Sequence, residues 1–213
     1  MALQKYHHLA LFIKGNTSET LSFDESVRGW TSRFSYVPDR IGSLRNNFYT
    51  YKDGNLWQHY SSNVNRASFY GVDYASNVTL ILNPKPSMVK VFKTINYEGA
   101  GDWVIPANGI ITDQDTGLQI SQYQIPTSLA DLETSLFTNN FKRKENKYFA
   151  NIVNVSAVTP GEVLFGQTMT GVKGFTSTIT FSSPLQADGV TPVAQTTKKE
   201  LFAVSSNYNQ SSY

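Results

Sequence analysis

Histidines are the side chains best suited to metal binding or acid–base catalysis, and their spacing here argues against both. His7 and His8 are adjacent, and His59 is the one other histidine in the chain. Neighbouring residues of a strand point to opposite faces, so His7 and His8 cannot both bind one metal ion from a regular strand. The histidines therefore predict neither a metal site nor a catalytic base.

One acidic segment has the spacing that begins an EF-hand calcium loop. Asp113, Asp115 and Gly117 fit the start of that loop. The loop also requires a bidentate Glu where this chain has Gln124. A hairpin turn over Asp115–Gly117 explains the segment better, because Asp and Gly are typical turn residues.

The chain offers no recognisable catalytic constellation. It has no Cys, which excludes thiolate catalysis, disulfides and thiolate metal sites, and it has no G-x-S-x-G, phosphate-loop or dinucleotide motif. A glycan hydrolase needs two carboxylates that face each other across a cleft. Asp24 with Glu25, or Asp131 with Glu133, could supply them, but 16 acidic residues produce such pairs by chance. We therefore predict a protein that is not an enzyme and holds no cofactor.

Large aromatic rings are the remaining candidates for binding. Such rings dominate interface energy when a partner's pocket buries them, although packing in the core is their more common role. Exposed rings could also stack on a sugar. The interface candidates are Trp30, Tyr51, Trp57, Tyr60 and Trp103.

The composition of the chain limits the classes of partner that it can be expected to bind. The net charge of +2 is too small to indicate nucleic acid or an anionic membrane, and the basic run Lys142–Lys144 fits the solvated tip of a hairpin. No apolar stretch approaches the length of a membrane span. The run Leu9–Ile13 is too short for a signal-peptide core, which predicts synthesis in a cytoplasm without export. Charged residues make up only 16% of the chain, as suits a protein whose surface is covered by partners.

A hairpin centred on Asp53-Gly54 is the clearest structural signal. This pair tolerates the positive φ angles of a type I′ turn. The resulting register places Tyr51 opposite Leu56 and Thr50 opposite Trp57. Both faces then have large rings, so we expect the hairpin to be buried on both sides or used as a contact surface.

Most other segments also favour strands, as the 12 Tyr and 13 Phe residues indicate. Further hairpins are predicted at residues 110–121 and at 141–155, the second turning near Glu145-Asn146. Ser87–Tyr97 fits a short helix or a strand, and its β-branched residues favour the strand. Pro126–Leu136 has the caps and the leucine stripe of a helix.

The sequence thus predicts a mainly β fold, with antiparallel sheets in a sandwich or barrel-like arrangement and one short helix. The glycine-rich loop that follows residue 98 predicts two subdomains, residues 1–98 and 99–213. The final residues, Asn207–Tyr213, are polar apart from two Tyr, and we expect them to be disordered alone and held by a neighbouring protein.

Several blocks of the sequence are similar to segments of one protein family. The blocks are Ser22–Trp30 (SFDESVRGW), Asn47–Trp57 (NFYTYKDGNLW), Val89–Gly99 (VKVFKTINYEG), Phe141–Ile152 (FKRKENKYFANI) and Lys199–Tyr208 (KELFAVSSNY). Together they resemble virion structural proteins of tailed bacteriophages, including crAss-like and marine phages, where such segments occur in large tail or neck proteins such as the muzzle.

The resemblance implies a virion protein that contacts other virion proteins and copies of itself in a symmetric assembly. It identifies no catalytic residue. It leaves open a free-standing ring or adaptor subunit and a detached terminal domain. A carbohydrate-binding module that docks phage to host glycans is the alternative, and it requires exposed rings that line a groove.

Overall fold

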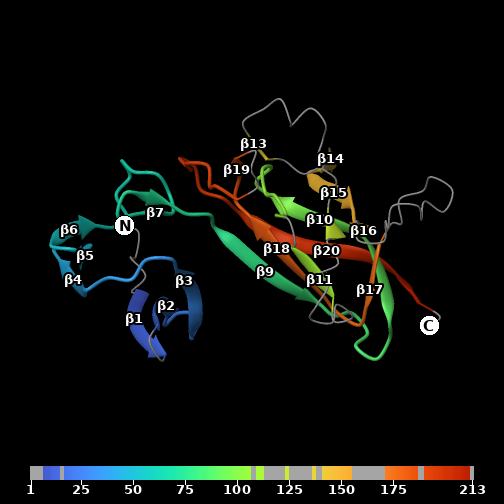
Figure 1. Ribbon diagram of the computed structural model, residues 1–213, viewed down its shortest axis with the longest axis horizontal. Coiled ribbons are helices and arrows are strands. Elements are labelled where there is room, and N and C mark those ends of the chain that lie inside the picture. Colours follow the sequence, from blue (N-terminus) through green and yellow to red (C-terminus); the bar gives the residue numbers. More distant parts are fainter. Residues whose placement is uncertain are drawn as a thin grey trace. The chain divides into compact units, whose positions relative to one another are not determined.

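The computed structural model describes residues 7–14, 17–106, 109–112, 123–124, 136–137, 141–154, 171–186 and 190–211 (Figure 1). The chain forms two compact units, Met1–Tyr74 and Ala75–Tyr213. Within the described residues every regular element is a β-strand. The prediction of a mainly β fold with antiparallel sheets is confirmed. The predicted helix at Pro126–Leu136 lies outside the described residues except for Leu136, which begins a short strand.

The first unit consists of strands joined by short turns. A sheet of order β1-β2-β3, a sheet of order β4-β5-β6 and the pair β7-β8 make up its described part. The strands are β1 His7–Lys14, β2 Thr17–Asp24, β3 Gly29–Phe34, β4 Arg40–Leu44, β5 Asn47–Lys52, β6 Asn55–Gln58, β7 Ser68–Phe69 and β8 Val72–Asp73.

The predicted Asp53-Gly54 hairpin is present with the predicted register. Tyr51 pairs with Leu56 and Thr50 with Trp57. Asp53 has a φ of 51° and Gly54 a φ of 77°, as a type I′ turn requires. Strand β4 joins β5 through a second turn of this kind at Arg45-Asn46, where φ is 48° and 68°.

The second unit contains the remaining strands. They are β9 Asn77–Leu82, β10 Lys90–Gly99, β11 Ile110–Thr112, β12 Tyr123–Gln124, β13 Leu136–Phe137, β14 Lys142–Lys144, β15 Lys147–Asn151, β16 Val153–Asn154, β17 Val172–Gly174, β18 Ser177–Ser182, β19 Leu185–Gln186 and β20 Leu201–Gln210. Strand β10 confirms the strand interpretation of the ambiguous segment after Ser87. The β14–β15 hairpin turns at Glu145-Asn146 as predicted, whereas the turn predicted at Asp115–Gly117 lies outside the described residues.

Strand β10 is the centre of one five-stranded sheet. It pairs with β15 through residues 94–98 and with β17 through residues 90–92. It also pairs with β20 along most of its length. Because β20 pairs with the same β10 residues, it occupies the opposite edge of β10 from β15 and β17. A second five-stranded sheet has the order β16-β12-β11-β18-β9.

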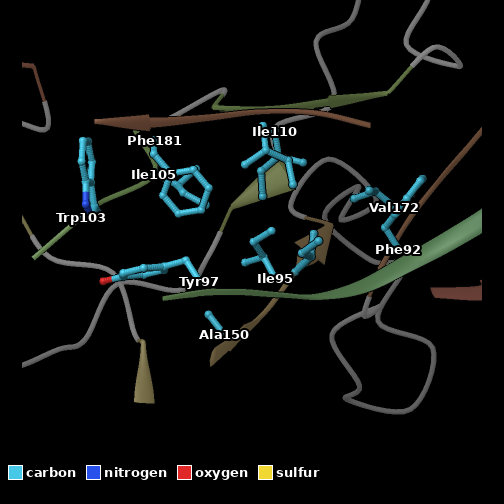
Figure 2. Packing of buried hydrophobic residues seen from close by; sticks show 11 residues of the cluster. Phe92, Ile95, Tyr97, Trp103, Ile105, Ile110, Ala150, Val172 and Phe181 are labelled. Carbon is cyan, nitrogen blue, oxygen red and sulfur yellow. The ribbon is translucent and has the colours of Figure 1, made fainter. Parts of the chain in front are cut away.

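The core lies between these two sheets. Figure 2 shows Ile110 and Phe181, from the sheet of β18, directed toward Ile95 and Tyr97 of β10. The rings of Tyr97 and Phe181 meet edge-on with centroids 5.5 Å apart. Burial alternates along β18 from Ser177 to Phe181, as expected when one face of a strand covers a core. In β10 the irregularity at Lys93 interrupts the alternation, and Ile95, Asn96 and Tyr97 are all buried.

Two sequence-based expectations differ from the structure in this unit. The polar segment that begins at Asn207 continues β20 and pairs with β10 as far as Gln210. The expectation that it is disordered without a neighbouring protein is therefore wrong for Asn207–Ser211, because this backbone finds partners within its own unit. Residues 212 and 213 lie outside the described residues. The structural boundary between the units falls after Tyr74 rather than after residue 98. The pairing of β10 with strands up to residue 210 explains why the chain does not divide within β10.

Replacing Gly54 by Val tests the turn. Space is available for a Cβ atom at Gly54 and at Gly42 of the adjacent strand β4, but only Gly54 has a positive φ. We expect Gly54→Val to lower the free energy of unfolding by about 1–3 kcal/mol. Gly42→Val should have no such cost, because a β-branched residue suits a strand. Chemical denaturation measures both, and equal effects would contradict the turn assignment.

Candidate interaction surface

One face of the β4-β5-β6 sheet presents apolar side chains to solvent. The register places Arg40, Tyr51 and Leu56 on this face, with Tyr49 and Leu44 further along it. Leu44 is 66% exposed, Leu56 57% and Tyr51 47%. We call Leu44, Tyr49, Tyr51 and Leu56 the outer strip. Its rings and branched side chains could provide contact area to a partner.

The opposite face of the same sheet covers an aromatic cluster. Thr50 is fully buried there, beside the half-buried Trp57 and His59. The ring of Tyr36, which is 3% exposed, stacks on His59 with centroids 4.9 Å apart and packs against Phe69 at 4.5 Å. The hairpin therefore has one buried face and one exposed face, so the expected alternative of burial on both sides is wrong, and a contact surface stays a prediction.

His59 belongs to a hydrogen-bonded chain inside this cluster. The Thr50 hydroxyl oxygen lies 2.7 Å from His59 Nε2 and 2.9 Å from the Tyr70 hydroxyl oxygen. Desolvation by burial lowers the pKa of His59 and raises the pKa of Tyr70. Both shifts favour the neutral forms. His59 thus packs and forms hydrogen bonds in this cluster as a neutral imidazole.

Trp57 is held within the cluster rather than presented to solvent. Its ring meets Tyr70 edge-on with centroids 5.3 Å apart. Its indole nitrogen is buried, and among the described residues it has no hydrogen-bond partner. A buried donor without an acceptor destabilises the fold. The contribution of Trp57 to this unit therefore comes from ring packing.

The other interface candidates fall in different environments. Trp30 is 56% exposed on β3 and packs edge-on against Phe23 at 5.3 Å, and Tyr60 is 71% exposed. Trp103 belongs to the second unit and is only 5% exposed. Its indole nitrogen donates a hydrogen bond to the Glu200 carbonyl at 2.9 Å. Of the five predicted residues, the structure brings Tyr51 and Trp57 together on opposite faces of one hairpin. It places Trp103 in the core.

Sequence reasoning missed Leu44, and it placed Leu56 opposite Tyr51 without counting it among the interface candidates. An aliphatic residue in a strand is normally interpreted as part of the core. The register of the β4–β5 pair could have identified Leu44, but the Arg45-Asn46 turn that fixes this register is a weaker signal than Asp-Gly.

The second unit contains a hollow with aromatic walls. Its volume is about 390 Å³, and its lining includes Trp103, Phe141 and Tyr148. Lys199 and Asp102 also line it and form an ion pair with each other. Burial lowers the pKa of Lys199. Most of the lining is apolar, so the hollow offers stacking surfaces rather than a catalytic pair.

The candidate catalytic and metal-binding residues form no site in the described part of the chain. Asp24 accepts hydrogen bonds from the backbone nitrogen and the hydroxyl of Ser26, at 2.8 and 2.6 Å, which is a turn-forming role. The pair Asp131 and Glu133 and the Asp113–Gly117 segment lie outside the described residues. Within the described ranges, no group of three acidic, His or Cys residues could hold a metal ion. The same ranges contain no helix with the length and apolar character needed to cross a membrane.

Comparison with protein families gives a match over part of the chain. Residues 64–154 match the Crassvirus muzzle protein C-terminal domain. The matched segment contains the blocks Val89–Gly99 and Phe141–Ile152 and extends from β7 to β16. The resemblance to virion structural proteins of crAss-like phages is thereby confirmed, and the match supports a crAss-like phage virion structural protein. No curated protein matches the chain.

Substitution of Trp57 separates ring packing from the indole N–H. Trp57→Phe keeps a ring against Tyr70 and removes the unpaired donor, so we expect the free energy of unfolding to change by less than about 1 kcal/mol. Trp57→Ala removes the ring and should cost about 2 kcal/mol or more. Urea denaturation distinguishes these outcomes, and a severe loss in Trp57→Phe would show that the N–H has a partner.

The state of His59 predicts a pH dependence of stability. Its pKa is lower in the folded protein than the ordinary value of about 6.5, so the unfolded chain takes up the proton first as the pH falls. Stability should therefore decrease as the pH drops below about 6.5. A His59→Gln variant, which retains His7 and His8, should show a flatter profile of melting temperature between about pH 7.5 and 5.5. Parallel profiles for the two proteins would contradict the assignment.

Proposed function

We propose that this protein is a non-enzymatic virion subunit of a phage tail or neck that acts through protein–protein contact. The observation on which the proposal depends is the match of residues 64–154 to a muzzle protein domain. Within the virion, its partners would be other virion proteins and copies of itself in a symmetric assembly. Closed rings of identical subunits are a common form of such assemblies.

The outer strip supports contact as the mode of action. Side chains that are exposed on a sheet, as Leu44, Tyr51 and Leu56 are, can be buried by a partner without reorganising the fold. Tyr51 is the ring best placed to act as an anchor, because it pairs with Leu56 across the hairpin and Leu44 extends the same face. Trp30 and Tyr60 remain candidates for the same role, while Trp57 would act indirectly by holding the hairpin.

A second candidate function is docking to host glycans. The hollow of about 390 Å³ in the second unit favours it, because rings of Trp103, Phe141 and Tyr148 line the space. Aromatic faces commonly stack on sugars. A glycan array with the purified protein tests this candidate, and Tyr148→Ala should remove any signal that arises in the hollow. Release of product from a polysaccharide would instead contradict a non-enzymatic role.

Virion incorporation tests the proposed function. Leu44→Ser with Leu56→Ser removes two branched side chains from the outer strip and leaves the aromatic cluster intact. A matched control is Val27→Ser with Val64→Ser, because these residues are 61% and 58% exposed in the same unit but lie outside the strip. Truncation of interface anchors typically costs 1–2 kcal/mol or more. We expect about a tenfold or greater reduction in copies per particle for the strip variant and wild-type incorporation for the control.

Circular dichroism and melting curves must first show that both variants are folded. Quantitative mass spectrometry of purified particles then gives the copy number of each. Equal incorporation of the strip variant and the control would exclude the outer strip as an interface. Absence of the wild-type protein from particles would reject the virion role itself.

A further inference from the structure

The two edges of the β10 sheet differ sharply in charge. Strand β14, at one edge, reads Lys142-Arg143-Lys144, and all three residues are exposed. Strand β20, at the other edge, contains no charged residue from Leu201 to Gln210. Exposed edges can pair with strands of other chains, and lysines are a common protection against this. One edge of this sheet is protected in that way and the other is not.

The backbone of β20 is open to a further strand within the described part of the chain. β20 pairs there with β10 alone, so alternate N–H and C=O groups along it point away from the sheet. The pairing is irregular at Phe202, an extra residue of β20, and opposite Asn207 and Tyr208, where the extra residue is Lys93 of β10. Ala203–Gln210 is therefore the part of β20 that has no bulged residue of its own. This length exceeds the usual strand of five or six residues, so the edge can support an extended pairing.

A hollow with many apolar lining residues lies beside the same edge. It has a volume of about 420 Å³ and is lined by Leu80 and Leu82 of β9, by Leu201 and Val204 of β20, and by one charged residue, Lys199, which precedes β20. Ile81 and Phe202, which also line it, are 70% and 73% exposed. A hollow with this lining beside an uncharged, unpaired edge gives an added strand both backbone partners and side-chain contacts.

We propose that β20 pairs antiparallel with β20 of a second copy of this chain. This inference rests on the proposed function in that it names a surface through which copies meet. The uncharged edge requires an uncharged partner strand, and β20 of a second copy meets this requirement over its whole length. Strand β14 of a second copy is an unsuitable partner for β20, because its three cations would be buried against the hollow.

Symmetry restricts the register of this pairing. In an antiparallel pair, residues directly opposite each other point to the same face. The two-fold axis that relates the two copies of β20 therefore passes between one residue and the same residue of the partner. Centring on Ser206 uses all of Ala203–Gln210 apart from its last residue. This register places Val204 opposite the partner's Tyr208 and Ala203 opposite the partner's Asn209. A β-branched residue facing an aromatic one is a favourable cross-strand pair.

Charge substitutions at the paired positions test the proposal. Ala203→Lys with Asn209→Lys places lysines opposite each other twice in the dimer, while both positions are exposed and point away from the core. Sedimentation of wild-type protein should show concentration-dependent dimerisation. The dissociation constant of the lysine variant should be about tenfold higher or more. The matched control Ser87→Lys with Asn151→Lys adds the same charge at exposed positions off β20 and should dimerise like the wild type.

A charge-reversed partner makes the test specific to edge pairing. Ala203→Glu with Asn209→Glu should also be monomeric alone, and mixing it with the lysine variant should restore dimers. Wild-type protein that stays monomeric at all concentrations would overturn the proposal, as would a mixture that fails to recover. Crosslinking of β20 to a different virion protein in particles would overturn the choice of a second copy. Failure in solution leaves incorporation into virions, the readout for the proposed function, unaffected.

Discussion

The pairing of β10 on both of its edges is the interaction on which the second unit depends. Three strands that span residues 147–210 hydrogen-bond to it, and its side chains Phe92, Ile95 and Tyr97 supply one wall of the core. Because β10 is central, even Lys90 at its start is fully buried. The Lys90 ammonium donates hydrogen bonds to the Pro84 and Lys85 carbonyls at 2.6 and 3.0 Å. Such partners are what makes burial of a charged group tolerable, and they tie the preceding turn to the strand.

The first unit depends instead on contacts that are close in the sequence. Its two-residue turns at Arg45-Asn46 and Asp53-Gly54 fix the register of three neighbouring strands at once. The Asp39 carboxylate reinforces the second turn by accepting a hydrogen bond from the Asp53 backbone nitrogen at 3.0 Å. This bond, together with nearby Lys52, lowers the pKa of Asp39. Once the register is set, strand alternation decides which rings enter the cluster around Tyr36 and which face solvent.

This contrast explains what could be predicted from the sequence. The Asp53-Gly54 and Glu145-Asn146 hairpins were predicted because turn chemistry and alternation are both local properties. The pairing of β20 with β10 was not predicted, since residues such as Asn96 and Ser205, 109 positions apart, show no shared pattern. The polar half of β20 is ordered by backbone pairing and by bonds such as Ser206 Oγ to the Thr94 carbonyl at 2.6 Å, and hydrophobic periodicity does not report either contact. Burial of Trp103 depends on the same long-range pairing, through its bond to Glu200.

The low overall charge of the chain is distributed in a way that matters for contact. Three consecutive cations occupy β14, whereas β9 and β20, which line one hollow, have none. A uniformly low charge would expose every sheet edge to unwanted pairing, and a uniformly high one would prevent assembly. The outer strip of the first unit exposes side chains that a partner could contact. Strand β20 of the second unit exposes backbone groups that could form hydrogen bonds with a further strand. Rings bind through shape and apolar area, while a strand edge binds through register. A protein with both kinds of surface can meet different neighbours by different physical means.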